Sequence, residues 1–266
     1  MPTLVVIPAR YASTRYPGKA LAELKGADGQ SKPLIQRSWD AACLVGGVDR
    51  VVVATDDDRI RTVAEGFGAE VVMTSDTCEN GTERCAEVLD RLGGGYDIVV
   101  NLQGDAPLTP PWFIEDLVSG LKANPVAEVA TPVLRANGAT LSGFHEDRRA
   151  GRVGGTTAVF GIDKNALYFS KEVIPYTVED YDNDAPTPVF HHVGVYAYRP
   201  SALAAYPRWE VGPLERLEAL EQLRFLERGV HVLCVEVEAR GREFWELNNP
   251  EDVDRIEAML KRMGMS

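Results

Sequence analysis

The sequence predicts an α/β fold in which helices flank a parallel-rich sheet. Short runs of Val and Ile alternate with amphipathic segments in the first half of the chain, as where residues 50–55 precede residues 59–67. Strands of this nearly continuous apolar kind are buried on both faces, which is typical of βαβ units. The 266 residues, 45% hydrophobic and 26% charged, suffice for a full core and exclude a disordered chain or a fibre.

Local signals mark each element of the first half. Pro8 ends the first strand, and the acidic run at 56–58 suits the start of a helix. Pro110 suits the first turn of another helix. The predicted strands are 4–8, 50–55, 70–74 and 97–102, and the predicted helices are 33–45, 59–67, 82–92 and 110–121.

The second half of the chain is less regular. Residues 135–157, rich in Gly, Ala and Arg, predict a long loop or mobile flap. The acidic, proline-containing stretch 180–188 predicts an exposed segment. Leucines recur along one side of residues 215–227, which predicts a single helix. Further strands are predicted at 157–162, 193–198 and 230–237, and an amphipathic helix at 250–263.

The charge balance limits the class of partner. Forty acidic and 28 basic residues give a formal net charge of −12, which disfavours nucleic-acid binding. The first apolar run is too short for a signal peptide, and no window reaches the length of a membrane span. The four cysteines form no CxxC pair and no zinc set. We therefore expect a cytoplasmic protein that binds neither nucleic acid nor membrane.

The strongest chemical signal is the segment 8–19, which follows the first predicted strand. It contains the cations Arg10, Arg15 and Lys19 and the hydroxyl of Ser13. Such a loop can bind a polyphosphate through backbone amides while the cations neutralise its charge. It matches neither the GxxxxGK[ST] nor the GxGxxG motif. The alternative is a solvated basic loop, but three bases in ten residues of an acidic chain favour the phosphate site.

Asp105 is the second candidate, because it follows the predicted strand 97–102 directly. Its carboxylate can hold Mg²⁺, or it can cap the helix that follows Pro107. The local sequence leaves both possibilities open, and the basic loop favours the metal. Ligands of such sheets bind beyond the carboxyl ends of the strands, so we expect segments 8–19, 55–58 and 103–105 to meet.

Together with further motifs, these segments resemble the signature of the cytidylyltransferases that activate sugar acids. The resemblance is closest to the 3-deoxy-manno-octulosonate (Kdo) cytidylyltransferase, or CMP-Kdo synthetase, family. It runs almost end to end, is strong over the first 105 residues and is weak at 135–165. The matching motifs are Pro8–Lys19, Ala54–Asp56, Gly81–Arg84, Gln103–Asp105, Ala166–Ser170, His192 with Gly194–Tyr198, Pro213–Glu215, Glu218, Glu221–Arg224 and Pro250–Asp252.

The resemblance implies Mg²⁺-dependent transfer of CMP from CTP to an acidic, Kdo-like acceptor, with release of pyrophosphate, in lipopolysaccharide biosynthesis. It implies one cytidylyltransferase domain, 1–266, with a nucleotide-diphospho-sugar transferase-like sheet. Within it, residues 1–130 form the CTP-binding half, 131–212 the acceptor lobe, and 213–266 the closing helices and strand. The smaller β-rich lobe is the expected dimerisation lobe of a homodimer.

Site residues can be carried over position by position. The resemblance implies that Arg10, Lys19 and Asp105 are catalytic, and that Asp105 and Asn248 hold the metal. The implied acceptor-binding residues are Lys171, His192, Glu218 and Gln222. The implied CTP-binding residues are Ala9, Arg10, Ser13, Arg15, Lys19, Ala54, Gly81, Thr82, Arg84 and Gln103.

The acceptor half departs from the family pattern. Asn248 stands where the family has a second metal-binding Asp, and Lys171 stands where it has Arg. His191 replaces a basic residue, and the strand at 157–160 lacks the usual lysine. Because the CTP motifs are complete, these changes predict an acceptor other than ordinary Kdo, such as another ulosonic acid or a phosphonate. They also fit a catalytically weak CTP-binding regulator, and a solvated helix face is the competing interpretation of Glu218.

Overall fold

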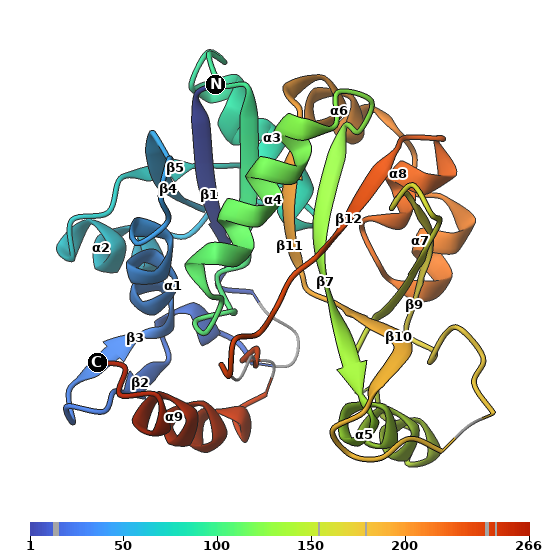
Figure 1. Cartoon of the computed structure of the whole chain (residues 1–266). Coiled ribbons are helices and arrows are strands. Elements are labelled where there is room, and N and C mark those ends of the chain that lie inside the picture. The colour runs from blue at the N-terminus through green and yellow to red at the C-terminus, as the bar shows by residue number, and fades with distance from the viewer. Residues whose placement is uncertain (13–15, 154, 179, 243–244, 248) are drawn as a thin grey trace. The chain divides into compact units, whose positions relative to one another are not determined.

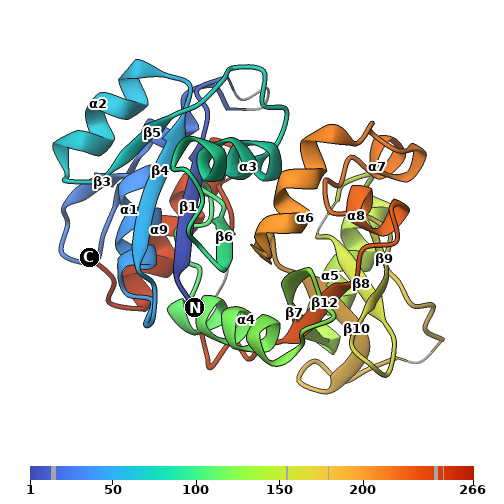
Figure 2. The same ribbon diagram turned by 90° about the horizontal axis from the view of Figure 1, so that it is seen from above.

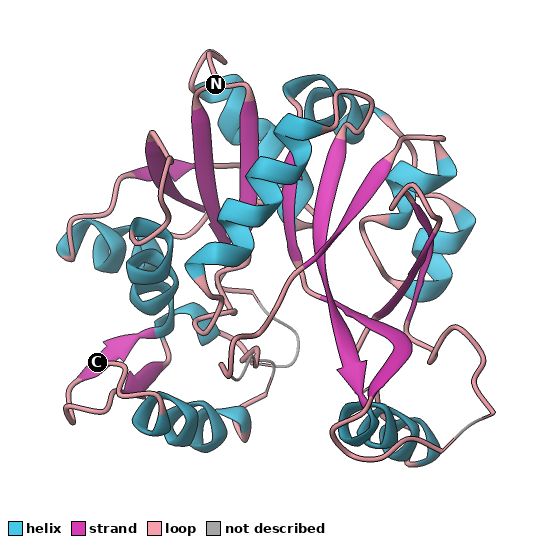
Figure 3. Ribbon diagram, in the orientation of Figure 1, coloured by secondary structure: helices cyan, strands magenta, loops and turns pink. Residues whose placement is uncertain are grey.

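The computed structural model describes residues 1–12, 16–153, 155–178, 180–242, 245–247 and 249–266 (Figure 1). Helices and strands alternate along most of the chain (Figure 3). The chain divides into two compact units, of which the first contains residues 1–115 and 239–266 and the second contains residues 116–238. None of the described helices is long and apolar enough to cross a membrane.

The first unit contains a parallel sheet of four strands in the order β5-β4-β1-β6, as the Val-rich runs predict. Seen from above, β1 lies between α1 on one side and α3 on the other (Figure 2). A small hairpin, β2–β3, and the 3-10 turn η1 complete the N-terminal part. The strands are β1 (Thr3–Ala9), β2 (Glu23–Lys25), β3 (Ser31–Pro33), β4 (Arg50–Thr55), β5 (Val71–Met73) and β6 (Ile98–Leu102). The helices are η1 (Lys19–Leu21), α1 (Leu34–Cys43), α2 (Asp58–Gly66), α3 (Gly81–Arg91) and α4 (Pro111–Ala123), which runs on into the second unit.

Side-chain caps fix where two of these helices begin. The Asp57 carboxylate accepts a hydrogen bond from the backbone N–H of Arg59 at 2.9 Å, which starts α2 as the acidic run predicts. The Asn80 side chain does the same for Glu83 at 2.9 Å and starts α3. Each cap satisfies a backbone donor that the helix itself leaves unpaired.

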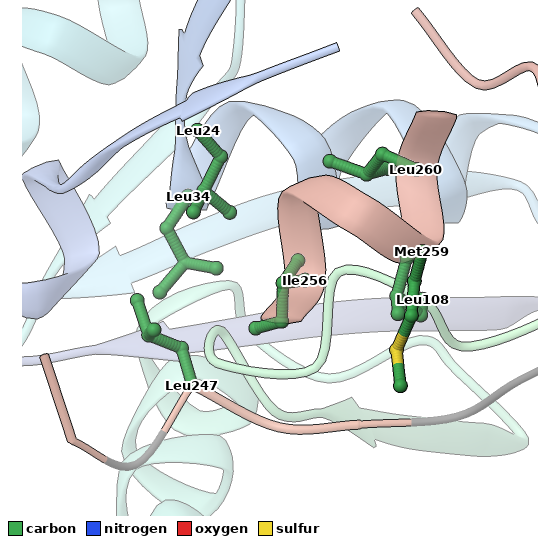
Figure 4. Close-up of a cluster of buried hydrophobic side chains, with 7 residues drawn as sticks. All are labelled: Leu24, Leu34, Leu108, Leu247, Ile256, Met259 and Leu260. Carbon is green, nitrogen blue, oxygen red and sulfur yellow. The ribbon is translucent and has the colours of Figure 1, made fainter. Parts of the chain in front are cut away.

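The C-terminal helix α9 (Asp252–Arg262) belongs to the first unit, where it lies beside the β2–β3 hairpin (Figure 1). Its apolar side chains join residues from the hairpin, α1 and two loops in one buried cluster (Figure 4). Each buried side chain of this size contributes about 1.5–3 kcal/mol of transfer free energy. The cluster, which also fixes the loop at Leu247, consists of Leu24, Leu34, Leu108, Leu247, Ile256, Met259 and Leu260.

The second unit contains a mixed, mostly antiparallel sheet around the long strand β7. β7 pairs antiparallel with β10 and β11 and parallel with β12, and β8 and β9 extend the sheet from β10. The strands are β7 (Val129–Asn137), β8 (Thr157–Phe160), β9 (Ala166–Ser170), β10 (Pro186–His192), β11 (Val195–Tyr198) and β12 (Val232–Glu236). The helices are α5 (Gly138–Arg149), α6 (Pro200–Ala205), η2 (Tyr206–Arg208), α7 (Pro213–Glu218) and α8 (Leu223–Glu227).

The predicted loop or flap at 135–157 is wrong. The segment continues β7 to residue 137, forms α5, and enters β8 at residue 157. The Asn137 side chain caps α5 through the backbone N–H of Thr140 at 2.9 Å, and Leu141 and Phe144 are buried beneath the helix. Two buried apolar residues in a segment rich in Gly and Arg are too few to show helical periodicity.

The predicted single helix at 215–227 is also wrong. The segment forms the two short helices α7 and α8, which are separated at Ala219, a residue in the left-handed conformation with φ 50°. Leu217, expected on the apolar face, is 83% exposed. The break lies next to Glu218, whose carboxylate accepts hydrogen bonds from β9 and Lys171.

Candidate active site

The carboxyl ends of three parallel strands bring the predicted nucleotide-binding motifs to one sheet edge. Ala9 at the end of β1 lies opposite Thr55 of β4, one residue after Ala54. On the other side of β1, Val6 lies opposite Asn101 of β6, shortly before Gln103. Together with the contact between Lys19 and Asp105, these registers confirm that segments 8–19, 55–58 and 103–105 meet, as far as the first segment is described (8–12 and 16–19). Ala9 and Ala54 are both buried strand residues, so their side chains shape this edge without offering polar groups.

Lys19 and Asp105 form the central contact of this edge. The Lys19 ammonium donates to the Asp105 carboxylate, and it also donates to the backbone carbonyl of Leu247 at 3.3 Å. The two side chains are 18% and 21% exposed, so solvent and ligands can reach both. Leu247 is held there by a second hydrogen bond, from its N–H to the Asp105 carbonyl at 2.9 Å.

Of the other predicted phosphate ligands, the structure describes one and leaves two undescribed. Arg10 is exposed directly after β1, where its guanidinium can reach a ligand in solution. Ser13 and Arg15 lie outside the described residues, and so does Asn248. The neighbour of Asn248 in the chain, Leu247, is the residue that contacts Lys19 and Asp105.

Tyr11 and Arg59 support the loop that carries these cations, a contact for which the sequence gives no signal. The Gly18 N–H donates to the Tyr11 carbonyl at 2.8 Å. Gly18 has φ 73°, and a Cβ there would lie 3.1 Å from the Tyr11 ring. The Arg59 guanidinium lies over that ring, 3.3 Å from its centroid. The start of α2 thus holds the loop from one side.

The motif Gly81–Arg84 opens α3 at the same edge. Thr82 and Arg84 are buried. The Arg84 guanidinium donates to the hydroxyl of Thr74 and contacts the Asp56 carboxylate at 3.2 Å, so it joins the ends of β4 and β5. A Cβ on Gly81 would lie only 2.9 Å from the Asn101 amide nitrogen. The space that the glycine leaves free is therefore filled by a polar side chain of β6.

The donor set at Asp105 fits Mg²⁺. The described residues contain no group of three or more His, Cys, Asp or Glu side chains that could enclose a metal ion. Mg²⁺ does not need such a cage, because it commonly keeps several waters and binds one or two carboxylates together with substrate phosphates. The partly exposed Asp105 carboxylate beside a basic loop matches that pattern.

A polar cluster lies in the second unit and consists of His192, Gln222, Glu218 and their hydrogen-bond partners. His192 lies at the centre of this polar cluster. Its Nε2 lies 2.9 Å from the Thr131 hydroxyl, and its ring contacts Phe169 edge-on at 4.9 Å between centroids. Burial, with a smaller effect from His191, lowers the pKa of His192 to about 3. The imidazole is therefore neutral near pH 7, so it can exchange hydrogen bonds with hydroxyl groups but provides no charge.

Gln222, directly before α8, and Glu218, the last residue of α7, border the same cluster. Gln222 is 1% exposed; its Oε1 accepts from the Tyr196 hydroxyl at 3.0 Å, and among the described residues its Nε2 has no hydrogen-bond partner. The Glu218 carboxylate accepts from the Ser170 hydroxyl at 2.7 Å and the Lys171 N–H at 2.9 Å. Glu218 is therefore not on a solvated helix face, and it fixes the backbone at Lys171.

The molecule is an α/β protein with cationic and acidic side chains at the strand ends of the first unit and a polar cluster in the second unit. A family model described as "Cytidylyltransferase" matches residues 4–233. The chain belongs to the cytidylyltransferase family, and it is an enzyme of that class.

Curated relatives and a solved structure match nearly the whole chain. The chain is 44% identical to a 3-deoxy-manno-octulosonate cytidylyltransferase of Maricaulis maris over 99% of both chains. It is 40% identical to an 8-amino-3,8-dideoxy-manno-octulosonate cytidylyltransferase of Shewanella frigidimarina, over 98% of this chain and 99% of the relative. A CMP:2-keto-3-deoxy-manno-octonic acid synthetase solved in complex with CTP matches with a TM-score of 0.83 and 32% identity, covering 99% of this chain and 100% of that one.

Proposed function

We propose that this enzyme transfers CMP from CTP to Kdo, with release of pyrophosphate and dependence on Mg²⁺. The observation that carries the proposal is the meeting of Lys19 with Asp105 where β1 and β6 end, in a chain of the cytidylyltransferase family. A relative named for Kdo is 44% identical over the full length, which supports Kdo as the acceptor. The product is a nucleotide-activated sugar acid for lipopolysaccharide biosynthesis.

Positioning and charge neutralisation are the main tasks of the CTP site. Lys19 and Arg10 bind the triphosphate, and Lys19 leaves Asp105 as phosphate oxygens replace that carboxylate. Asp105 holds the metal, and when bound Mg²⁺ supplies charge neutralisation at the phosphate oxygens. A hydroxyl oxygen of the acceptor forms a bond to the α-phosphorus and gives up its proton to water, while the bond from that phosphorus to the bridging oxygen of pyrophosphate breaks. Lys19 and Arg10 stabilise the charge that develops on the pyrophosphate.

The polar cluster of the second unit offers groups that match those of a sugar acid. The Nε2 of Gln222, which has no hydrogen-bond partner within the described part of the chain, can donate to a carboxylate or hydroxyl oxygen of the acceptor. The neutral imidazole of His192 suits hydroxyl groups, and Lys171 supplies a positive charge for the carboxylate. These roles assign the polar cluster to an anionic, polyhydroxylated acceptor.

A second acceptor merits the same assay. The Shewanella relative is named for the 8-amino-3,8-dideoxy analogue and is 40% identical to this chain. Lys171 and Asn248 also motivate a changed acceptor. The relatives favour Kdo first, and the 8-amino analogue is the second candidate.

Pyrophosphate release measured with CTP, Mg²⁺ and a panel of acceptors tests the proposal. The panel contains Kdo, its 8-amino-3,8-dideoxy analogue, another ulosonic acid and a phosphonate. We expect turnover with Kdo above that with every other compound. Higher turnover with another compound of the panel would make that compound the acceptor in place of Kdo. CTP binding with no turnover of all four compounds would favour a regulator.

A homodimer is the assembly we propose. The second unit exposes large apolar side chains in β9, the last strand in the sheet order, and in the segment that follows it. Leu167 is 68% exposed, Tyr176 87% and Val178 78%. Large apolar side chains exposed to this extent favour a surface that a partner covers. Light scattering should give twice the 29.1 kDa chain mass, and Leu167→Glu should shift it toward one chain mass.

A further inference from the structure

The buried ion pair between Glu215 and Arg224 links α7 to α8 in the second unit. Arg224 Nε and Nη2 donate to the two Glu215 carboxylate oxygens at 2.6 and 2.7 Å. The two side chains are 3% and 9% exposed. Burying two charges is costly, and a well-packed apolar pair often stabilises a fold as well or better. A contribution to stability is therefore a weak explanation for this pair.

Aromatic and backbone contacts hold the pair in place. The Arg224 guanidinium lies 4.1 Å from the centroid of the Tyr206 ring. The Tyr206 hydroxyl donates to the Glu221 carbonyl at 3.0 Å, directly before Gln222. From α8, the Glu227 carboxylate accepts from the N–H groups of Leu214 and Glu215 at 3.0 and 3.1 Å, which caps the first turn of α7. The C-terminal end of α8 is thus hydrogen-bonded to the N-terminal turn of α7.

This arrangement fixes the connection between the helices. α7 and α8 have six and five residues, which is too short for either helix to be stable alone. Between them the chain reverses through Ala219, whose φ of 50° is costly for a residue with a Cβ. Glu218 and Gln222 lie on either side of that residue. Their positions therefore depend on whatever holds α7 against α8.

We infer that Glu215 and Arg224 are positioning residues for acceptor binding, which they serve by holding the 218–222 connection. Through that connection they place Glu218 against Ser170 and Lys171, and Gln222 against Tyr196. The inference rests on the proposed function, because the acceptor is what Gln222 and Lys171 are proposed to bind. It assigns the pair to recognition of the acceptor and not to binding of CTP, whose proposed ligands lie in the other unit.

The variant that tests this inference removes both charges together. Glu215→Leu with Arg224→Met leaves no buried unpaired charge, so the chain is expected to fold. We expect the KM for Kdo to rise at least about 10-fold, because a small displacement of binding groups has large effects. The Kd for CTP should stay within about 2-fold of wild type, because the first unit is untouched. Arg224→Lys keeps the charge but loses the two-pronged contact, and it should raise the KM for Kdo to an intermediate value.

The control pair is Arg135→Met with Glu236→Gln, which breaks an exposed ion pair of 3.0 Å in the same unit. It should leave the KM for Kdo unchanged. A folded double variant with wild-type KM and kcat would overturn the inference; if that variant does not fold, a wild-type KM in Arg224→Lys would overturn it instead.

Hydrogen exchange of the peptide covering residues 213–228 separates this inference from the proposed function. Failure of the wild-type enzyme to use Kdo would contradict the proposed function alone. In that case faster exchange at 218–222 in the double variant, with unchanged exchange in β1, still supports the positioning role. Unchanged exchange at 218–222 would overturn it.

Discussion

The Lys19 ammonium donates to the Asp105 carboxylate although 86 positions separate the two residues in the sequence. The contact joins the loop after β1 to the loop after β6, and it sets a proposed phosphate ligand beside a proposed metal ligand. Neither group is deeply buried, so each can exchange its partner for one supplied by a nucleotide. In the absence of CTP, each balances the charge of the other.

Removal of the Lys19 charge should weaken CTP binding. Charged hydrogen bonds contribute about 1.5–3 kcal/mol, so Lys19→Ala should raise the Kd for CTP about 10- to 100-fold in calorimetry. Lys32→Ala is the matched control, because Lys32 pairs with Asp40 on the surface at 2.7 Å and should leave the Kd unchanged. Equal affinities of the wild type and Lys19→Ala would remove Lys19 from the phosphate site.

Asp105→Asn should abolish metal-dependent turnover without unfolding the protein. We expect turnover to fall at least about 100-fold, as for other groups that stabilise charge in the transition state. The melting temperature should change by no more than about 4 °C, because a half-exposed ion pair contributes little to stability. Asp40→Asn provides the control for loss of a surface ion pair. Near-normal turnover of Asp105→Asn with Mg²⁺ would leave this carboxylate a structural role only.

Gly81→Ala tests the close approach at the start of α3. The new Cβ would lie 2.9 Å from the Asn101 amide nitrogen and 3.2 Å from that of Gln103, so both side chains must move. We expect about a 10-fold weaker affinity for CTP and a destabilisation of about 1–3 kcal/mol. No atom of the described residues lies within 4 Å of the Cβ that Gly66→Ala would add in α2, so this variant should be neutral or stabilising by up to about 1 kcal/mol. If both variants behave alike in calorimetry and urea unfolding, the close approach of Asn101 to Gly81 affects neither CTP affinity nor stability.

The lowered pKa of His192 predicts how stability depends on pH. An exposed imidazole has a pKa of about 6.5, whereas burial holds that of His192 at about 3. Between these values the unfolded chain binds the proton and the folded chain does not. The contribution of His192 to the free energy of unfolding is therefore complete above pH 6.5 and is lost as the pH falls from 6.5 toward 3. His192→Gln should therefore reduce the slope of the unfolding free energy by up to about 1.4 kcal/mol per pH unit between pH 4 and 6.

Urea unfolding at a series of pH values provides this measurement. His145→Gln, a change at an exposed position of α5, is the control and should leave the slope as it is in the wild type. A wild-type slope in His192→Gln would mean that the imidazole is not held neutral by the fold.

The sequence predicts the first unit well because its signals are local. Buried Val-rich strands and the acidic run that caps α2 each lie within a few residues, and both appear in the structure where they are expected. The order of the strand ends then follows from the parallel βαβ arrangement. Thus the meeting of Lys19 and Asp105 could be anticipated, although their direct ion pair could not.

The second unit could not be predicted to the same extent because its elements depend on distant contacts. Helix α5 begins at Gly138, where a Cβ would lie 2.2 Å from the Asp182 carbonyl oxygen, a constraint from 44 residues away. The break between α7 and α8 depends on Glu218 reaching Ser170 and on the pairing of Glu215 with Arg224. The leucine spacing in that segment contains no information about either contact.

Steady-state pyrophosphate release with CTP, Mg²⁺ and Kdo is the decisive measurement of the proposed function. We expect a kcat/KM for Kdo of about 10⁴ M⁻¹s⁻¹ or higher, within the ordinary range of enzymes. Because the family resemblance implies a metal-binding Asp where Asn248 stands, the same assay on Asn248→Asp tests whether this proposed change of a metal ligand limits the reaction. CTP binding with no release of pyrophosphate from CTP in the presence of Kdo, in the wild type and in Asn248→Asp alike, would contradict the proposed function.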